Sequence, residues 1–456
     1  QIGTLCEKYN LYFILDASQT AGTIEIDMEQ NHISAICFTG HKGLFGPQGT
    51  GGIALADGVC VKPLLSGGSG VHSFERKHPM ELPAALEAGT LNGHGIAGLH
   101  AALDWIKKTG IAAIHEKEMA LAEQFQRGIE TIPGIHIYGG EKRVAAIVSC
   151  NLADLDSAYV SDCLAENYGI ATRAGAHCAP QIHTHFGTEK QGMVRFSFSC
   201  FNTTEEVEKA VRAMQDIAAE NRGKVTAYVG AGGKTSSIRK RAETLRAEGK
   251  RVLILTTTKM MVPQEQEIFT AYEQTGQESV ISATASVWQE RRAAEKQLKE
   301  RVQSVLDTYG CCVAGSLIPG TEKFGMLPEK LMEDLLYLAD EILIEADGSA
   351  HMPVKAPAEH EPVLFPYMDE VVIVMGAHAI GKPLREVCHR VDYAKKILKC
   401  DADKIVTATD IRVLAEQGYA IPIQKQFPWM KISKVTGKDI KLCLTAEKKD
   451  KERDKQ

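Results

Sequence analysis

The chain has 456 residues, of which 44% are hydrophobic and 24% are charged, so it is long enough for about two to four globular domains and too apolar for a disordered protein. Its formal net charge is -6, which excludes nucleic acid as the main partner because that role usually needs a basic face. No uncharged apolar run can span a bilayer and no signal-peptide pattern opens the chain, so we expect a cytoplasmic protein that does not bind a membrane.

The 12 cysteines include no Cys-x-x-Cys pair. They therefore predict neither a disulfide framework nor an obvious zinc site. The sequence begins with Gln1 and with residues typical of the end of a helix, so we expect it to start within a domain.

Two apolar runs near the start of the chain each end in a polar stretch. Residues 11–15 predict a buried strand that ends at Asp16, and residues 33–38 predict another that leads into residues 39–42. A lysine at the mouth of a buried strand, followed by the glycine-rich residues 43–52, is placed to be desolvated and nucleophilic, as a Schiff-base lysine must be. A carboxylate in the same sheet can keep a pyridine nitrogen protonated. Taken singly, each residue is equally compatible with a solvated lysine or a turn-capping acid.

Read as an ordered pair, Asp-Ala-Ser-Gln-Thr-Ala-Gly at 16–22 and Thr-Gly-His-Lys-Gly-Leu-Phe-Gly-Pro-Gln-Gly at 39–49 resemble the class V aminotransferases. These are pyridoxal-phosphate (PLP) enzymes, and the match is to their cysteine desulfurase and selenocysteine lyase branch. The resemblance implies the following roles: Lys42 forms the Schiff base with PLP, Asp16 pairs with the pyridinium, Gln19 bonds the ring hydroxyl, and Thr39 and His41 face the phosphate.

Residues 86–92 resemble the Glu-Ala-Gly-Thr-x-Asn segment of the same family. In that family the threonine reaches the cofactor phosphate of the neighbouring subunit, so the resemblance implies a homodimer with Thr90 at the PLP site. A helix N-terminus capped by Thr90 or Asn92 fits the same residues.

Alternating helical and strand periodicity continues to a second chemical stretch. Helices are predicted at 97–107, 111–131 and 157–167, and strands at 135–138 and 145–150. The predicted loop 170–180 contains a cysteine that is flanked by Arg173 and His177. This electropositive setting favours the thiolate form of the cysteine. The alternative is an inert buried thiol.

The loop resembles the family's Arg-x-Gly-x-His-Cys loop, which implies that Cys178 takes sulfur or selenium from the substrate. The strand predicted at 192–198 carries Arg195, which the resemblance implies binds the substrate carboxylate, with Arg173 and His177 beside it. An arginine on the exposed face of an edge strand is the alternative. Thr203 and Glu206 then fit a capping box at the start of an amphipathic helix.

The character of the chain changes after residue 221. A strand predicted at 225–229 runs into a glycine-rich turn and a helix start, where backbone N–H groups and the helix dipole favour phosphate. Lys234 can reach the outer phosphates and the Thr235 hydroxyl can bind magnesium. The turn is shorter than a full Walker A motif, because Tyr228 occupies the place of its first glycine. The predicted nucleotide-binding residues are Gly230, Gly232, Gly233, Lys234, Thr235 and Ser236.

Further apolar runs at 252–255, 341–344, 371–374 and 405–408 predict more strands, and their alternation with helices predicts a mainly parallel sheet. Residues 256–259 and 345–349 fall at strand ends, where ligands gather in such sheets. Glu345 and Asp347 are therefore candidates to hold magnesium or to orient a water, with turn-capping acids as the alternative.

Four stretches of this region resemble the accessory proteins of selenium-dependent molybdenum hydroxylases, the YqeC type, over about residues 224–445. They are Gly-Ala-Gly-Gly-Lys-Thr, Leu-Thr-Thr-Thr-Lys-Met, Ile-Glu-Ala-Asp-Gly-Ser and residues 354–362. The resemblance implies a maturation factor that binds ATP or GTP with Mg²⁺. Residues 424–435 do not fit the family pattern.

We therefore predict an α/β protein in three parts. Residues 1–220 form the C-terminal part of a fold-type I PLP-dependent transferase, residues 221–446 form a P-loop NTPase-like domain with a mainly parallel sheet, and residues 447–456 form a charged tail. The portion that precedes the Asp-x-x-Gln strand in the family is not in this sequence.

The predicted function is release of sulfur or selenium from L-cysteine or L-selenocysteine to an acceptor protein, coupled to maturation of a selenium-dependent molybdenum hydroxylase. Two alternatives differ in class: a non-catalytic P-loop delivery module with an inactive PLP-domain remnant, and a plain aminotransferase, for which Cys178 would be dispensable.

Overall fold

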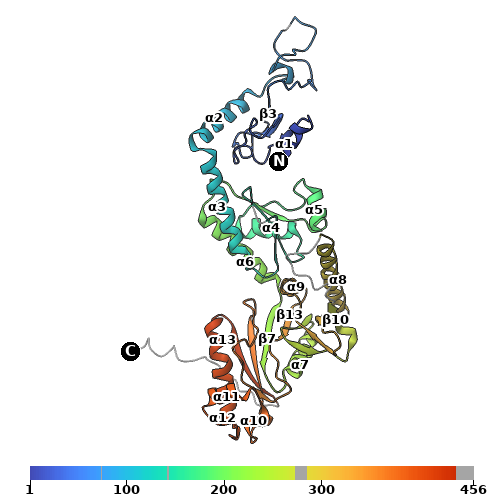
Figure 1. Ribbon diagram of the computed structural model, residues 1–456, viewed down its shortest axis with the longest axis vertical. Helices are drawn as coiled ribbons and strands as arrows, with labels where there is room; N and C mark the ends of the chain where they lie inside the picture. The colour runs from blue at the N-terminus through green and yellow to red at the C-terminus, as the bar shows by residue number, and fades with distance from the viewer. Residues whose placement is uncertain (73, 141–142, 273–284, 438–456) are drawn as a thin grey trace, which may run out of the picture. The chain divides into compact units, whose positions relative to one another are not determined.

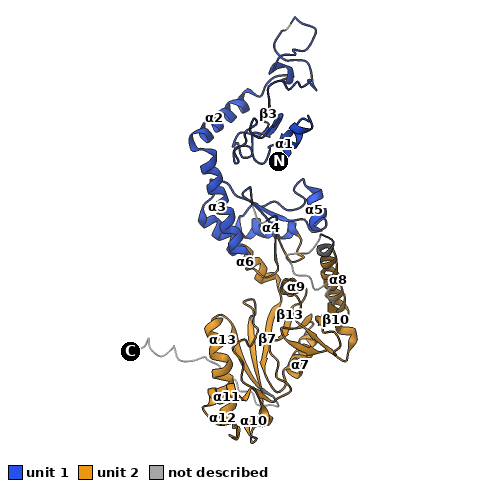
Figure 2. Cartoon of the chain, in the orientation of Figure 1, with its two compact units in different colours: residues 1–130, 137–150, 157–213 blue, residues 131–136, 151–156, 214–456 orange. Residues whose placement is uncertain are grey.

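The computed structural model of the chain describes residues 1–72, 74–140, 143–272 and 285–437, which form an α/β protein divided into two compact units (Figures 1 and 2). Unit 1 comprises residues 1–130, 137–150 and 157–213. Unit 2 comprises residues 131–136, 151–156 and 214–456. The predicted charged tail lies outside the described residues.

The helices up to residue 221 are α1 (Ile2–Lys8), η1 (Ala84–Leu86), α2 (Gly93–Thr109), α3 (Ile111–Ile129), α4 (Ser157–Tyr168), α5 (Pro180–Phe186) and α6 (Thr204–Asn221). The strands in this part are β1 (Ile14–Asp16), β2 (Ala35–Thr39), β3 (Gly51–Leu55), β4 (Ile135–Tyr138), β5 (Ile147–Leu152) and β6 (Val194–Ser197).

The first sheet has the order β1-β2-β3, with β1 parallel and β3 antiparallel to β2. Asp16 is in register with Cys37, so β1 and β2 end at the same edge of the sheet. The prediction of a buried strand at residues 11–15 is wrong in its extent and its burial, because β1 has only three residues and Ile14 is 65% exposed. Its position explains this: within the described sheet, β1 is an edge strand that pairs with β2 alone.

The second sheet has the order β4-β5-β6 and packs against α3, where the rings of Phe125 and Phe196 lie 4.3 Å apart between centroids. The capping box predicted before α6 is confirmed. The Thr203 hydroxyl accepts a hydrogen bond from the Glu206 amide, and the Glu206 carboxylate accepts one from the Thr203 amide. These bonds satisfy amides that the helix itself leaves unpaired.

The helices from residue 222 on are α7 (Lys234–Ala247), η2 (Gln266–Ile268), α8 (Ala285–Tyr309), α9 (Glu329–Leu335), η3 (Ala377–Ala379), α10 (Leu384–Val387), α11 (Val391–Leu398), α12 (Ala408–Val413), the π-helical η4 (Leu414–Ala420) and α13 (Ile421–Gln426). The strands are β7 (Lys224–Gly230), β8 (Val252–Thr256), β9 (Lys259–Met261), β10 (Phe269–Tyr272), β11 (Cys311–Leu317), β12 (Lys323–Gly325), β13 (Glu341–Glu345), β14 (Val354–Lys355), β15 (Glu370–Gly376), β16 (Cys388–His389) and β17 (Lys431–Gly437).

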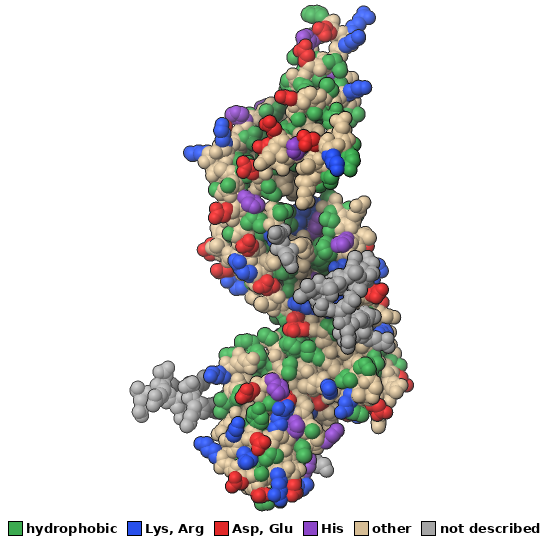
Figure 3. Space-filling model, viewed as in Figure 1, with side chains coloured by type: hydrophobic (Ala, Val, Ile, Leu, Met, Phe, Trp, Pro, Cys, Tyr) green, Lys and Arg blue, Asp and Glu red, His purple; other side chains and the backbone are tan. Residues whose placement is uncertain are grey.

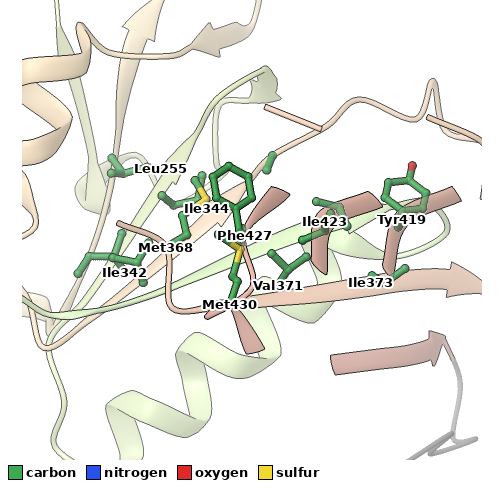
Figure 4. Packing of buried hydrophobic residues seen from close by; sticks show 14 of the residues in the cluster. Leu255, Ile342, Ile344, Met368, Val371, Ile373, Tyr419, Ile423, Phe427 and Met430 are labelled. Atoms are coloured by element: carbon green, nitrogen blue, oxygen red, sulfur yellow. The ribbon is translucent and has the colours of Figure 1, made fainter. Parts of the chain in front are cut away.

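The large sheet of unit 2 has the order β17-β15-β7-β13-β8-β11-β12-β9, with β10 beside β11, and only the pairings of β12 among those described are antiparallel. The predicted mainly parallel sheet is thus confirmed. Alternate residues of each strand face opposite sides. In β7, Ala227 and Val229 join the cluster that includes α9 and α11–α13, whereas Tyr228 packs against Ile238 of α7. Figure 4 shows part of the first cluster, with Tyr419 and Ile423 beside Ile373.

The strand predicted at residues 405–408 is wrong. Ile405 is 51% exposed and forms a single bridge with Pro383, and the chain then enters α12. The Thr407 side chain caps this helix in a capping box with Asp410, which favours a helix start over a continuing strand. Residues 424–435, which fit no family pattern, contain the end of α13 and most of β17.

The start of β7 is held by an ion pair. Arg222 contacts both oxygens of Asp369, at 2.7 and 2.9 Å, and Asp369 also accepts the amide of Val225 at 2.7 Å. A bidentate Arg–carboxylate pair fixes orientation as well as distance. The pair thereby joins the N-terminal ends of β7 and β15, which lie at the opposite end of these strands from the glycine-rich turn.

The surface carries mixed charge. On the face shown in Figure 3, Lys and Arg side chains are interspersed with Asp and Glu side chains over both units. None of the described helices is long and apolar enough to cross a membrane.

Candidate functional sites

Asp16 and Lys42 lie at the shared edge of β1 and β2. The Asp16 carboxylate accepts hydrogen bonds from the hydroxyl and the amide of Ser18, at 2.5 and 2.9 Å. These two bonds lower the pKa of Asp16 and outweigh the opposing effect of burial, and the positive charge of Lys42 adds the smallest contribution, also downward. The carboxylate therefore stays ionised, as a partner for a protonated pyridine nitrogen must. This edge fits the charge pattern that PLP needs.

Of the other predicted cofactor residues, Thr39 and His41 contact each other at the end of β2. The Thr39 hydroxyl and the His41 Nδ1 atom are 2.7 Å apart. Gln19 and Thr90 are exposed. The cap of α2 is Asn92, whose side chain accepts the amide of Gly95 at 3.0 Å, so of the two capping residues considered from the sequence it is Asn92 that caps this helix.

Cys178 lies in an exposed loop between α4 and α5, next to two guanidinium groups. The Nη2 atom of Arg173 is 3.3 Å from the Cys178 sulfur. The His177 ring bonds the carbonyl oxygen of Arg173 through Nε2, at 2.8 Å. His177 and Cys178 have φ values of 52° and 62°, so two consecutive residues occupy the left-handed region. This local turn brings the sulfur back to Arg173.

Arg195 reaches the same loop from β6. Its backbone exchanges two hydrogen bonds with the backbone of Arg173, at 2.9 and 3.2 Å, which joins the loop to the sheet. Burial lowers the pKa of Arg195, and the charge of Arg173 lowers it further. Among the described residues, the buried Nε of Arg195 has no hydrogen-bond partner. An anion such as a carboxylate would satisfy both the charge and this N–H.

Burial also lowers the pKa of His177, as do the charges of Arg195, His183 and Arg173, while the bond to the Arg173 carbonyl opposes them. His177 is therefore neutral near pH 7 and can accept or donate a proton. The structure thus brings Arg173, His177, Cys178 and Arg195 together on the second sheet. Asp16, Thr39, His41 and Lys42 lie at the end of the first sheet, and among the described residues no hydrogen bond joins one group to the other.

The predicted phosphate-binding turn joins β7 to α7 in unit 2. Gly230, Gly232 and Gly233 have φ values of 93°, 78° and 128°, a backbone conformation that other residues rarely adopt. A Cβ atom on Gly232 would lie 2.6 Å from the Cα atom of Gly376. The turn is therefore packed tightly against the end of β15, and its amides precede the N-terminus of α7.

Lys234, Thr235 and Ser236 form the first turn of α7. Lys234 is only 4% exposed and donates to the carbonyl oxygen of Gly230 at 2.7 Å, whereas Ser236 is exposed. The Thr235 hydroxyl donates to Glu345 at 2.9 Å. Burial raises the pKa of Glu345, against the opposing effects of Lys234 and Thr235. A hydroxyl and a carboxylate in contact at a phosphate-binding turn can share one magnesium ion.

Asp347 lies behind this turn and is fully buried. Its Oδ2 atom accepts the amide of Gly230 at 3.0 Å and the hydroxyl of Tyr419 at 2.9 Å. The ammonium groups of Lys234 and Lys355 lie 3.2 and 3.5 Å from its two oxygens. The Oδ1 atom, although near Lys234, is in hydrogen-bonding geometry with none of the described residues. Asp347 is thus shared between two buried cations.

On the side of Asp347 that faces Lys355, a series of ion pairs with alternating charge leads toward the surface. Lys355 pairs with Glu361 at 2.8 Å, and Glu361 pairs with Arg390 at 3.0 Å. Burial alone would raise the pKa of Glu361, but the bond and charge of Lys355, the Ala358 amide and Arg390 together outweigh it, and the pKa is lowered. The sequence analysis assigned no role to Lys355, Glu361, Arg390 or Tyr419. The one local signal is a lysine set among the apolar residues 354–358.

Comparison with known families fits these observations. Residues 1–210 match the class-V aminotransferase family, and residues 226–392 match the family described as YqeC protein. The chain therefore contains one region similar to the class-V aminotransferases and a second region similar to the YqeC family.

Individual relatives match the first region. A probable cysteine desulfurase of Methanothermobacter thermautotrophicus is 34% identical over 223 residues, which cover 48% of this chain and 56% of that protein. A cysteine desulfurase of Shigella flexneri is 31% identical over 219 residues, covering 47% and 53%. The solved cysteine desulfurase of Thermococcus onnurineus is 29% identical, covers 48% of this chain and 55% of that chain, and has a TM-score of 0.44. The chain spans about half the length of the curated relatives it matches.

We predict that Cys178 is alkylated much faster than the buried thiols. Burial raises the pKa of Cys150 to about 12 and that of Cys311 to about 11, whereas Cys178 is exposed beside Arg173. Iodoacetamide labelling followed by peptide mass spectrometry measures the rates. Arg173→Met should slow Cys178 labelling several-fold, because the contact with the sulfur is lost, and should leave the exposed Cys60 unchanged as the internal control. Equal slowing of both cysteines would contradict this assignment.

The lowered pKa of Glu361 predicts how unit 2 responds to acid. A carboxyl whose pKa is lower in the folded protein than its ordinary value of 4.5 stabilises the fold above that value, and the stabilisation is lost as the pH falls through the folded pKa. Glu361→Gln should therefore lower stability at pH 7 and reduce the further loss between pH 5 and about pH 3. Urea unfolding across this range measures both. An unchanged acid-side slope, with Glu248→Gln on the exposed end of α7 as control, would contradict the prediction.

Proposed function

We propose that the chain releases sulfur or selenium from L-cysteine or L-selenocysteine with PLP, and that its YqeC region binds ATP or GTP with Mg²⁺. The observation that carries the first part is the contact of 3.3 Å between Arg173 and the sulfur of Cys178, in a region that matches class-V aminotransferases. We further propose that the released atom serves the maturation of a selenium-dependent molybdenum hydroxylase, through an acceptor protein.

In the proposed reaction, each of several residues of unit 1 has its own role. When bound, PLP supplies an electron sink for the charge left at the substrate Cα atom. Lys42 accepts the Cα proton, and Asp16 contributes the negative charge beside the pyridine ring. Arg195 binds the substrate carboxylate with its free Nε and its charge, which orients the side chain toward Cys178.

Cys178 then acts as the nucleophile. Its thiolate attacks the substrate sulfur or selenium, the bond from that atom to Cβ breaks, and the electron pair of this bond stays with the carbon fragment. The fragment gains one proton at Cβ, regains the Cα proton from Lys42 and leaves as alanine, while the extra chalcogen remains on Cys178. Transfer to an acceptor thiol restores the cysteine.

A homodimer is part of the proposal. Large apolar side chains between η1 and the end of β3 are unusually exposed, with Leu64 at 97%, Leu65 at 72% and Met80 at 70%. Exposed apolar surface of this kind is typical of interaction sites. Thr90 lies in the same part of the chain and is exposed, which supports its proposed contact with the cofactor phosphate of a second copy.

The nucleotide site of unit 2 is proposed from its loop. The positive φ values of the three glycines, the helix N-terminus that follows, and the Thr235–Glu345 contact support binding of a Mg²⁺–nucleotide, in a P-loop NTPase-like domain. The sheet supports the same proposal, because β13 lies directly beside β7 and brings Glu345 to the turn.

A second candidate function is a non-catalytic P-loop delivery module. The observation that favours it is the exposure of Asp16, Lys42 and Cys178. In this alternative, unit 1 is a docking surface rather than an enzyme.

The visible spectrum with added PLP decides between the two. We expect a band that Lys42→Ala abolishes and Lys62→Ala, an exposed lysine of the same unit, preserves. With L-cysteine or L-selenocysteine the protein should form alanine, and Cys178→Ser should lower alanine formation by at least about a hundredfold, since it removes the nucleophile. Absence of a Lys42-dependent band would favour the delivery module, and alanine formation indifferent to Cys178 would favour a transaminase.

Titration calorimetry with MgATP and MgGTP tests unit 2. Lys234→Ala should weaken binding by about ten- to hundredfold, the usual effect of one hydrogen bond to a charged group. Lys240→Ala, on the exposed face of the same helix, is the matched control. A protein that binds neither nucleotide, or for which both substitutions have the same effect, would contradict the proposed site.

A further inference from the structure

Lys355 is a completely buried lysine, and among the described residues its ammonium has no hydrogen bond or ion pair with the glycine-rich turn, residues 230–236. Its ammonium donates to the carbonyl oxygen of Gly348, pairs with Glu361 at 2.8 Å and lies 3.5 Å from Asp347. It is held in strand β14, which pairs with β16 so that Lys355 is in register with His389. Burying an ammonium is costly unless it is paired and hydrogen-bonded, so its position calls for an explanation.

The carboxylate next to Lys355, that of Asp347, is also close to the lysine of the turn. The Lys234 ammonium donates to the Gly230 carbonyl oxygen at 2.7 Å and lies 3.2 Å from the Asp347 Oδ1 atom. Its charge also acts on Glu345, whose pKa burial raises and Lys234 lowers. To reach a phosphate, Lys234 must move away from Asp347. In the interior of a protein, leaving a carboxylate without a cation costs more free energy than at the surface.

Lys355 supplies the second cation. It lies on the Oδ2 side of Asp347, whereas Lys234 lies on the Oδ1 side, where no hydrogen bond is formed among the described residues. The Oδ2 atom of Asp347 is therefore held by hydrogen bonds from Tyr419 and the Gly230 amide, with the Lys355 ammonium 3.5 Å away, whereas Oδ1 has only the Lys234 ammonium near it, at 3.2 Å.

We infer that Lys355 is a positioning residue of the phosphate-binding turn: it neutralises Asp347 from behind and so leaves Lys234 free to bind phosphate. This inference rests on the nucleotide binding proposed for unit 2 and adds a role for residues that touch no nucleotide. It also assigns Asp347 to the support of the turn, and leaves Thr235 and Glu345 as the pair that faces magnesium.

Two substitutions in the chain of charges should have opposite effects on affinity. Lys355→Met keeps the length of the side chain and removes its charge, so Asp347 retains Lys234 more strongly and binding of MgATP or MgGTP should weaken by about tenfold. Glu361→Gln removes the negative charge that competes with Asp347 for the ammonium of Lys355. Lys355 then neutralises Asp347 more fully. Affinity should stay equal or rise, although the fold is less stable. A purely structural role of the network predicts a loss for both substitutions.

A double-mutant cycle tests whether Lys355 acts through Asp347. In the Asp347→Asn background, Lys355→Met should change affinity less than twofold, because the charge that Lys355 balances is gone. Lys323→Met, an exposed lysine on β12, is the matched control and should bind as the wild type does. Equal weakening by Lys355→Met in both backgrounds would mean a long-range or structural effect and would overturn the inference. If Lys355→Met does not fold, Tyr419→Phe replaces it in the cycle, with a smaller loss expected.

A second readout needs no nucleotide. Acetic anhydride labelling of Lys234, followed by mass spectrometry, should increase in Asp347→Asn and decrease in Lys355→Met, while labelling of the exposed Lys250 stays constant. Labelling of Lys234 that does not move would overturn the inference even if the wild-type protein binds nucleotide. Labelling that moves as expected in a protein that binds neither MgATP nor MgGTP would preserve the inference and reject the proposed ligand.

Discussion

A single carboxylate with no exposed surface, Asp347, is the constraint on which the glycine-rich turn of unit 2 and the elements around it depend. It lies just beyond β13 and accepts hydrogen bonds from the turn after β7 and from η4, while β14 supplies a cation. Because a buried charge is tolerated only when it is paired and hydrogen-bonded, these elements must assemble around it together. The glycines of the turn give the backbone its conformation, and Asp347 fixes where that backbone lies.

Unit 1 is built on the opposite plan. Its polar groups gather at strand ends and in one tight loop, and Asp16, Lys42 and Cys178 are all exposed. The exposed apolar side chains near Leu64 give this unit further surface that is available for contacts.

The sequence predicts the features that depend on neighbours along the chain. Periodicity locates β4 with its observed bounds, the spacing of Thr203 and Glu206 locates the start of α6, and three glycines locate the turn before Lys234. Features that depend on distant segments escape it. The exposure of β1 is set by its place at the edge of a sheet, and the contact of Tyr419 with Asp347 joins residues 72 positions apart. At residues 405–408 two local features compete, an apolar run that favours a strand and the capping box at Thr407 that favours a helix start. The structure has the helix.

The strand order of unit 2 also has a consequence for biosynthesis. The central strand β7 is flanked by β13 and β15, and Gly230 bonds to a residue 117 positions later, while Arg222 bonds to one 147 positions later. Pairing over such separations slows folding, and a nascent chain emerges at only about 5–20 residues per second. The apolar β7 therefore leaves the ribosome several seconds before either partner exists. During that interval its unpaired edges are open to wrong pairing, so production of this protein in cells should depend on chaperone supply and on translation speed.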